Sequence, residues 1–293
     1  MQISIKTLCL YFFFYLSNNL AGQTPNPLID KKNTFGQERW VDSIYSKLSL
    51  EEKVGQLFMP MVFTERDSSH FYLTLDLVKK YKVGGLVFSL GGPVEQTKWL
   101  NAFQKESKVP LMTAMDAEWG VAMRLDSVMP FPWPMTLGAV KDSTLLRKIG
   151  KRMGMQEKRL GIHYSFGPTL DINTNPKNPI IGNRSYGSSP NRVIKQALAI
   201  MKGHHEAGVL TSGKHFPGHG DTSKDSHKTL PTVSLSSERL KEVEFKPYRK
   251  LINNGLTSVM VAHLDVPSIS EKGLPTSLSE DVIQNILKND LDF

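Results

Sequence analysis

The segment Lys214–His227 concentrates side chains that can exchange protons. It holds three histidines and two aspartates within fourteen residues. Pro217, Gly218 and Gly220 exclude a helix here, so the segment is predicted to be a loop that follows a strand. Binding and catalytic side chains are often carried on loops that a rigid scaffold positions. This loop is therefore the first candidate for a functional site.

Three kinds of chemistry fit this loop. It could bind a metal ion, since histidine and aspartate are good zinc ligands, but the spacings match no ligand pattern that we can justify. It could perform acid–base catalysis, because Asp225 and His227 are two residues apart and share one side of an extended backbone. Asp225 would fix the imidazole tautomer and favour its charged form, which leaves the other ring nitrogen of His227 to protonate a leaving group. The third possibility is polar contacts that only stabilise the loop.

The elements that must position this loop alternate between strand and helix. Helical patterns separate several apolar, β-rich runs, and this alternation predicts an α/β fold with a parallel sheet. Strands that are apolar along their whole length fit a sheet covered on both faces. The runs are Met59–Phe63, Val83–Leu90, Val109–Met115, Ile162–Leu170, Val209–Ser212 and Leu256–Ala262.

Helices are predicted from caps and apolar spacing. A capping box at Ser49–Glu52 begins one helix. Further helices are expected over Val193–Glu206, Ser279–Leu287 and Leu235–Leu251, and Pro247 should kink or break the last of these.

Both a (β/α)8 barrel and a doubly wound open sheet satisfy this pattern. Polar residues favour the barrel, because Asp116, Asp171, Lys214-His215 and His263 end or follow four different runs. Active sites of such barrels are built at the C-terminal ends of several strands at once. The sequence therefore predicts an α/β protein, an incomplete (β/α)8 TIM barrel with about six of the eight strands present.

The loop resembles the signature of family 3 glycoside hydrolases, and in particular of the NagZ-like β-N-acetylhexosaminidases. The shared residues are Lys-His-Phe-Pro-Gly-His-Gly-Asp-Thr from Lys214, then Asp-Ser-His at 225–227 and Leu230-Pro231. The resemblance covers about residue 40 to the end of the chain. Further segments that resemble the family are Leu50–Leu57, Asp116–Gly120 with Arg124, and Gly182–Gly187.

This resemblance implies roles for individual residues. His227 would be the general acid/base and Asp225 its orienting partner, and no metal or organic cofactor is implied. Trp119 stands where the family usually has glycine, so we expect it to narrow the site or to stack on a sugar. Charged, forked groups suit sugar hydroxyls, and the residues expected to bind the sugar are Asp116, Arg124, Arg184, Lys214 and His215.

A retaining glycosidase also needs a carboxylate nucleophile. The resemblance puts an aspartate nucleophile at the end of the next strand, shortly after Leu291–Phe293, and therefore beyond this chain. Asp290 and Asp292 lie on the wrong side of that strand. We expect a truncated enzyme, inactive as this fragment, whose complete form removes terminal β-linked N-acetylglucosamine with retention. Unpaired strand edges, which proteins avoid, favour truncation over a natural endpoint.

Two other functions stay open. A β-glucosidase of the same family is one, although such enzymes usually carry a carboxylate acid on a separate domain, which the Asp225–His227 pair argues against. A non-catalytic glycan-binding remnant is the other. The sequence also leaves open whether water or phosphate ends the second step.

The N-terminus indicates export. Lys6 precedes a short apolar run, Leu8–Leu16, and small residues follow at Ala21 and Gly22, so residues 1–22 are predicted to be a signal peptide. The protein is therefore expected to be secreted or periplasmic, with no stable membrane insertion after cleavage. An uncleaved anchor is the alternative.

The rest of the chain is predicted to be an N-terminal extension, residues 23–38, and a catalytic barrel, residues 39–293. The only cysteine, Cys9, would leave with the signal peptide, so no disulfide is expected. The net charge of +8 comes from short, scattered basic runs, which makes nucleic acid a poor partner. The expected partner is a glycan of the cell wall or the environment that contains N-acetylglucosamine. His70, His204 and His205 are expected to be solvated, and His263 structural or supporting.

Overall fold

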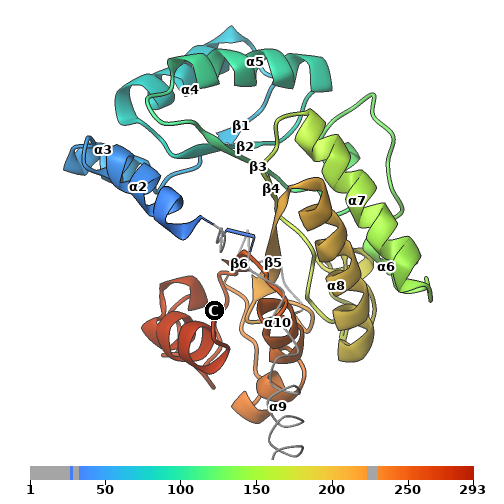
Figure 1. Cartoon of the computed structure of the whole chain (residues 1–293). Helices are drawn as coiled ribbons and strands as arrows, with labels where there is room; N and C mark the ends of the chain where they lie inside the picture. Colours follow the sequence, from blue (N-terminus) through green and yellow to red (C-terminus); the bar gives the residue numbers. More distant parts are fainter. Residues whose placement is uncertain (1–26, 29–32, 223–229) are drawn as a thin grey trace, which may run out of the picture.

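The computed structural model describes residues 27–28, 33–222 and 230–293. Six parallel strands pair in chain order from β1 to β6, which confirms the predicted α/β class and number of strands. In Figure 1 they form an arc with α4, α5, α7, α8 and α10 on its outer side. The strands are β1 (Met61–Val62), β2 (Gly85–Phe88), β3 (Met112–Met115), β4 (Tyr164–Ser165), β5 (Leu210–Phe216) and β6 (Ser258–Val261).

Helices begin where the sequence provides caps. Ser49 and Glu52 form the predicted capping box, and Pro93 and Pro190 occupy first helical positions. The α-helices are α2 (Thr34–Tyr45), α3 (Leu50–Gly55), α4 (Ser68–Tyr81), α5 (Pro93–Glu106), α6 (Pro134–Gly138), α7 (Ser143–Arg159), α8 (Pro190–Ala207), α9 (Ser237–Glu242) and α10 (Phe245–Ile252). Three 3-10 turns, η1 (Val121–Met123), η2 (Gly182–Arg184) and η3 (Thr276–Leu278), and a π-helix, η4 (Asp281–Asp290), are also described.

Two predicted boundaries were wrong. Strand β4 ends at Ser165 rather than at Leu170, and Pro168, two residues before that predicted end, has no N–H to donate to a ladder. The predicted helix over 235–251 is split into α9 and α10, but the break precedes Pro247. Pro247 lies in the first turn of α10, where a helix does not require its N–H.

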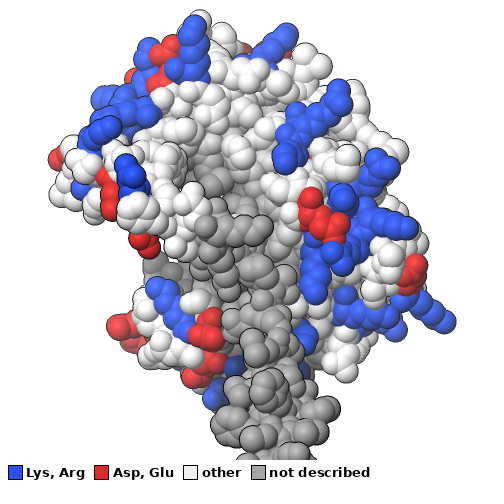
Figure 2. Space-filling view, viewed as in Figure 1, with Lys and Arg blue, Asp and Glu red and all other residues white. Residues whose placement is uncertain are grey.

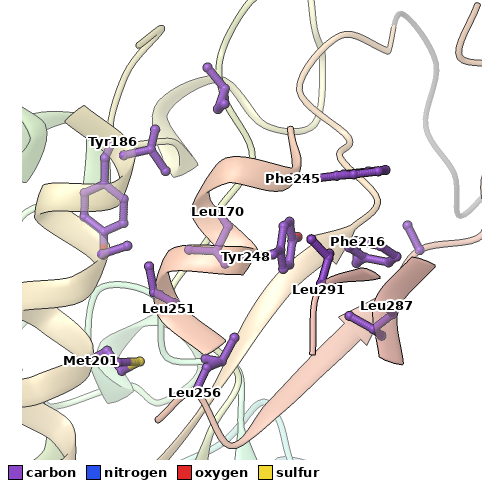
Figure 3. Packing of buried hydrophobic residues seen from close by; sticks show 14 of the residues in the cluster. Leu170, Tyr186, Met201, Phe216, Phe245, Tyr248, Leu251, Leu256, Leu287 and Leu291 are labelled. Atoms are coloured by element: carbon purple, nitrogen blue, oxygen red, sulfur yellow. The ribbon is translucent and has the colours of Figure 1, made fainter. Parts of the chain in front are cut away.

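The larger core surrounds β5. The ring of Phe216 lies 5.1 Å from that of Tyr248 and 5.5 Å from that of Phe245. Leu287 and Leu291, from the end of the chain, pack into the same cluster (Figure 3). Burying such side chains contributes roughly 1.5–3 kcal/mol each. This cluster therefore fixes the strand whose end carries Lys214 and His215.

Helices α7 and α8 lie almost in backbone contact. A Cβ atom on Gly150 would clash with the carbonyl of Ile200, and one on Gly203 with the carbonyl of Arg147. The side chain of His204 is trapped between these helices, 3% exposed, so the expectation that it is solvated was wrong. Its Nε2 lies 3.4 Å from Oε1 of Glu157, and its Nδ1 lies 2.9 Å from the carbonyl of Ile200.

Basic side chains gather on the outer surface, over α7 and α8 (Figure 2). The inner face of α7 packs on α8, so its lysines and arginines project outward. Glu206 of α8 neutralises part of this charge by pairing with Arg147 and Lys151. In the part of the chain that the structure describes, no helix has both the length and the apolar character needed to cross a bilayer.

The His204–Glu157 pair should make the free energy of unfolding depend on pH. Burial lowers the pKa of His204, but Glu157 outweighs this effect, and the pKa lies above its ordinary value. A raised pKa stabilises the fold fully below the unfolded value of about 6.5, and the stabilisation is lost as the pH rises through the folded value. Glu157→Gln should therefore cost about 3 kcal/mol near pH 5.5 and distinctly less near pH 8.5, measured by urea unfolding at both pH values.

The matched control is Glu206→Gln, which breaks an exposed pair between the same two helices and should cost under about 1 kcal/mol at either pH. His205 does not contribute to the pH dependence of this loss between pH 5.5 and 8.5, because burial lowers its pKa to about 4 and it stays neutral in the folded protein over this range. Equal losses at the two pH values would show that the His204–Glu157 pair is not the source of the pH dependence.

Candidate active site

The charged residues that the sequence singled out meet at the C-terminal ends of the strands. Asp116 directly follows β3, and Lys214 and His215 lie in the last half of β5. Arg124 directly follows η1, and Arg184 ends η2 in the long connection between β4 and α8. Parallel strands bring their carboxyl ends to one face of the sheet, which is why segments so distant in sequence come together.

Lys214 joins the end of β5 to the end of β3 through buried ion pairs. Its Nζ lies 2.7 Å from Oδ1 of Asp116 and 2.8 Å from Oε1 of Glu118. Lys214 is only 1% exposed, and an unpaired ammonium group at this depth would be strongly destabilising. The two carboxylates therefore satisfy a charge that water cannot reach.

Glu118 is shared between Lys214 and Arg184. Nε of Arg184 donates to Oε2 at 2.9 Å and Nη2 donates to Oε1 at 2.6 Å, which is a two-pronged contact. Burial by itself raises the pKa of Glu118, but Lys214 and Arg184 lower it to about 2. Glu118 is therefore a fixed anion near neutral pH.

Asp171 orients His215 by binding both its ring and its backbone. Its Oδ2 lies 2.6 Å from Nδ1 of His215 and accepts from the backbone N–H of the same residue at 3.1 Å. Its Oδ1 accepts from the backbone N–H of His219 at 2.6 Å. Burial raises the pKa of Asp171, but His215 and the N–H of His219 hold it below its ordinary value.

These contacts define the tautomer of His215. Nε2 of His215 lies 3.3 Å from Nη2 of Arg184. A guanidinium group can only donate, so Nε2 accepts and the ring proton resides on Nδ1, facing Asp171. The ring of His215 is thus held between the carboxylate of Asp171 and the guanidinium group of Arg184.

Asp116 links the buried part of the network to its exposed rim. Nη2 of Arg124 lies 2.5 Å from Oδ2 of Asp116, whereas Lys214 binds the other carboxylate oxygen. Burial raises the pKa of Asp116, but Lys214 and Arg124 hold it below its ordinary value. The side chains of Lys214, Glu118 and Asp171 are at most 1% exposed. Those of Asp116, Arg124, Arg184 and His215 are 16–26% exposed, so these four can touch a ligand.

The flanks of the predicted acid/base loop are held against this network. Asn178 Nδ2 donates to the carbonyl of His219 at 2.7 Å, and a Cβ on Gly220 would clash with the carbonyl of Ile172. On the far side, Oγ1 of Thr232 donates to Oδ2 of Asp265, just beyond β6, at 2.9 Å. Both flanks therefore end on the face that carries the network. Asp225 and His227 themselves lie outside the described residues.

A further carboxyl group adjoins this loop. Glu244, at the turn between α9 and α10, packs so closely under Gly218 that a Cβ there would clash with its side chain. Burial raises the pKa of Glu244 to about 7, despite the pair with Arg239 at 2.6 Å. Its carboxylate contacts Arg239 rather than any member of the network.

Sequence reasoning named five of the gathered side chains and missed two. The structure brings together Asp116, Arg124, Arg184, Lys214 and His215, whereas Glu118 and Asp171 had been assigned no role. Glu118 could have been found, because it lies two residues after Asp116 and so shares its side of an extended chain.

Other sequence-derived expectations have mixed outcomes. His263 is exposed and its Nδ1 contacts Oγ of Ser277, not the network. His70 is half-buried and accepts from the backbone N–H of Phe63 through Nε2 at 3.1 Å, so it is not simply solvated. Among the described residues, no group of three or more histidine, cysteine or acidic side chains is arranged to hold a metal ion.

Comparison with known proteins gives one consistent result. Residues 49–293 match the glycosyl hydrolase family 3 N terminal domain. A β-hexosaminidase of Neisseria meningitidis serogroup B is 34% identical over 209 residues, which are 68% of this chain and 57% of that protein. A family 3 β-N-acetylglucosaminidase structure from Paenibacillus sp. str. FPU-7 has a TM-score of 0.78 and 37% identity, covering 84% of this chain and 48% of that one.

A β-glucoside phosphorylase structure, bound to 2FGlc, is also similar. Its TM-score is 0.83 at 28% identity, and the match covers 92% of this chain and 49% of that one. The chain thus spans about half the length of the relatives it matches. With its parallel strands, its charged network at their C-terminal ends and this match over most of its length, the chain belongs to glycosyl hydrolase family 3.

Proposed function

We propose that this chain forms the larger part of the catalytic domain of a retaining β-N-acetylglucosaminidase, which removes terminal β-linked N-acetylglucosamine from glycans. The observation that carries the proposal is the network of Asp116, Glu118, Lys214, Arg184 and His215 at the C-terminal strand ends. The β-hexosaminidase and β-N-acetylglucosaminidase relatives support the choice of substrate.

The rim of the network suits a neutral, hydroxyl-rich ring. Asp116 offers acceptor lone pairs, and the guanidinium groups of Arg124 and Arg184 offer donors. Their partners already hold these groups in place, so little side-chain entropy is lost when a sugar binds. The terminal sugar would therefore bind on this rim.

The chemistry would proceed in two steps around His227. In the first, the imidazolium of His227 gives its proton to the leaving oxygen while a carboxylate attacks the anomeric carbon and forms a glycosyl ester. In the second, the neutral imidazole takes a proton from water, and the hydroxide equivalent displaces the carboxylate. Asp225 would orient the ring and favour its charged form in the first step.

We place the attacking carboxylate on a strand supplied from beyond Phe293. Strand β1 lies at one end of the sheet and β6 at the other, so each leaves an edge unpaired within the described ranges 33–222 and 230–293. Apolar side chains stand exposed near β1: Leu57 by 82%, Phe58 by 60% and Met61 by 49%. A mainly apolar cavity of about 700 Å³ lies beside them, between α3 and α4. Further strands with their helices would cover both the edge and this surface.

The signal-like residues 1–22 support secretion or a periplasmic location, where wall or environmental glycans are the accessible substrates. A second candidate is phosphorolysis of a β-glucoside, which the similarity to a β-glucoside phosphorylase favours. Product analysis in phosphate buffer separates the two, since hydrolysis releases the free sugar and phosphorolysis releases a sugar phosphate.

The first prediction from the proposed function concerns the proton donor. In the complete enzyme, His227→Gly should abolish cleavage of N,N′-diacetylchitobiose, whose leaving oxygen needs a proton, but spare a dinitrophenyl glycoside that leaves as a stable anion. The measurement is kcat/KM for both substrates. A loss of about 100-fold or more for the disaccharide alone is expected, and equal losses on both would contradict an acid role.

The second prediction concerns the rim. Asp116→Asn keeps the shape of the side chain but removes the charge that pairs with Lys214 and Arg124. In the complete enzyme it should lower kcat/KM about 100-fold, as expected when charged hydrogen bonds to a buried group are lost. Asp126→Asn, an exposed carboxyl in the same connection, is the control and should change kcat/KM less than about twofold. A mild effect of Asp116→Asn would remove this residue from the sugar site.

The third prediction concerns completeness. The 293-residue chain should hydrolyse no aryl N-acetylglucosaminide and should aggregate through its exposed apolar edge. A longer chain that supplies the closing strands should be active and more soluble, as judged by turnover and by size-exclusion chromatography. Hydrolysis by the 293-residue chain alone would contradict a nucleophile beyond Phe293.

A further inference from the structure

A stacked pair of tryptophans stands beside the charged network. The rings of Trp119 and Trp133 lie 4.1 Å apart at an interplanar angle of 10°. Trp119 is half-buried, and Trp133 is 45% exposed. Each ring covers one face of the other, so Trp133 presents its outer side to the surroundings.

The backbone holds this pair next to the site. Trp119 directly follows Glu118, whose carboxylate binds Lys214 and Arg184. The carbonyl of Trp119 accepts from the N–H of Phe131 at 3.2 Å, which folds the chain back and brings Trp133 over Trp119. Within the connection between them, Arg124 bonds Asp116 at 2.5 Å. The loop that carries the two rings is thus tied to the rim at both Glu118 and Asp116.

The helix that follows Trp133 is tied to the other side of the rim. Trp133 is the N-cap of α6, and a Cβ on Gly138 of that helix would clash with the carbonyl of Tyr186. Tyr186 lies two residues after Arg184 and is almost completely buried, so this junction is rigid. The indole pair therefore lies between the segments that supply Glu118 and Arg184.

The other tryptophans show how this pair differs from a core contact. Trp99 is buried, and its Nε1 donates to Glu95 at 2.9 Å. Within the described residues, neither Trp119 nor Trp133 has a buried indole N–H that lacks a hydrogen-bond partner. An aromatic surface beside a polar cluster is typical of a site for an amphipathic ligand.

We propose that Trp119 and Trp133 form an aromatic subsite for a second sugar ring, on the leaving-group side of the terminal sugar. This rests on the proposed function, because the terminal ring is placed on the rim of Asp116, Arg124 and Arg184. A β-linked pyranose carries its hydroxyls around the edge and axial C–H groups on its faces. The electron-rich face of an indole attracts such C–H groups, and the indole N–H can donate to a hydroxyl or an acetamido oxygen.

The test compares the binding of a monosaccharide with the binding of a disaccharide. The ligands are N-acetylglucosamine and N,N′-diacetylchitobiose, with glucose and cellobiose in parallel. They are titrated against the complete enzyme carrying His227→Gly, which is expected to leave the disaccharides uncleaved, and binding is followed by saturation-transfer NMR. This parent protein should bind the disaccharide more tightly than the monosaccharide, and Trp133→Ala should reduce that preference about tenfold while leaving the monosaccharide affinity unchanged.

Controls separate stacking from structure. Trp133→Leu keeps apolar contact with Trp119 but lacks an aromatic face, so it should behave like Trp133→Ala, and Trp133→Tyr should restore most of the preference. Trp40→Ala removes an exposed indole on α2, which lies outside the site segments, and should change nothing. Melting temperatures of all variants show whether each one folds.

Each outcome supports or overturns the subsite, the proposed function or both. A disaccharide preference that survives both Trp133→Ala and Trp133→Leu overturns the subsite and leaves the proposed function standing. Preference for cellobiose over glucose that depends on Trp133, without binding of the N-acetylglucosamine series, supports the subsite but overturns the proposed substrate. Failure of the parent protein, the complete enzyme carrying His227→Gly, to bind any of the four sugars overturns both proposals.

Discussion

The site depends on one buried ammonium group. Lys214 extends from β5 past β4 to reach the end of β3, where Asp116 and Glu118, almost a hundred residues earlier in the chain, receive its charge. A cation at this depth is tolerated only with anions at hydrogen-bond distance. The same contact fixes how the ends of β3 and β5 lie relative to each other. Arg124 and Arg184 depend on this arrangement, because they bind the carboxylates of Asp116 and Glu118.

The network is close to neutral as a whole. Lys214, Arg124 and Arg184 balance the carboxylates of Asp116, Glu118 and Asp171. Such a site has no excess charge to attract a strongly anionic ligand, but it presents oriented donors and acceptors at its rim. These features match an uncharged sugar. Basic side chains gather instead on the outer surface, over α7 and α8 (Figure 2).

Periodicity predicted the sheet but not all of the site. Alternating patterns locate strands, and polar residues directly after a strand, such as Asp116, could be assigned to the catalytic face in advance. Asp171 follows a strand that the structure ends early, so its position beneath His215 depends on irregular backbone after Pro168. His204 was misjudged because its helix looks amphipathic in isolation. Only the close approach of α8 to α7, which small residues permit, makes its position an interior one.

The same electrostatics explain why the proton donor should come from outside the network. Asp116, Glu118 and Asp171 all have pKa values below their ordinary ones, and the pKa of Glu118 is about 2. None of the three can hold a proton near neutral pH, so none can serve as a general acid there. His215 is no better placed, because both ring nitrogens are already engaged.

A group on a neighbouring loop escapes this constraint, since it can titrate near neutrality without disturbing the ion pairs that hold the strands together. Glu244 has a pKa of about 7, but its carboxylate is committed to Arg239. The described flanks of the loop, held by Asn178 and Asp265, lie on the same face as the network, and the proposed function takes its proton donor from this loop. Under the proposed function, the permanently charged rim would bind the sugar, and a separate group on that loop would give up and regain its proton in every cycle.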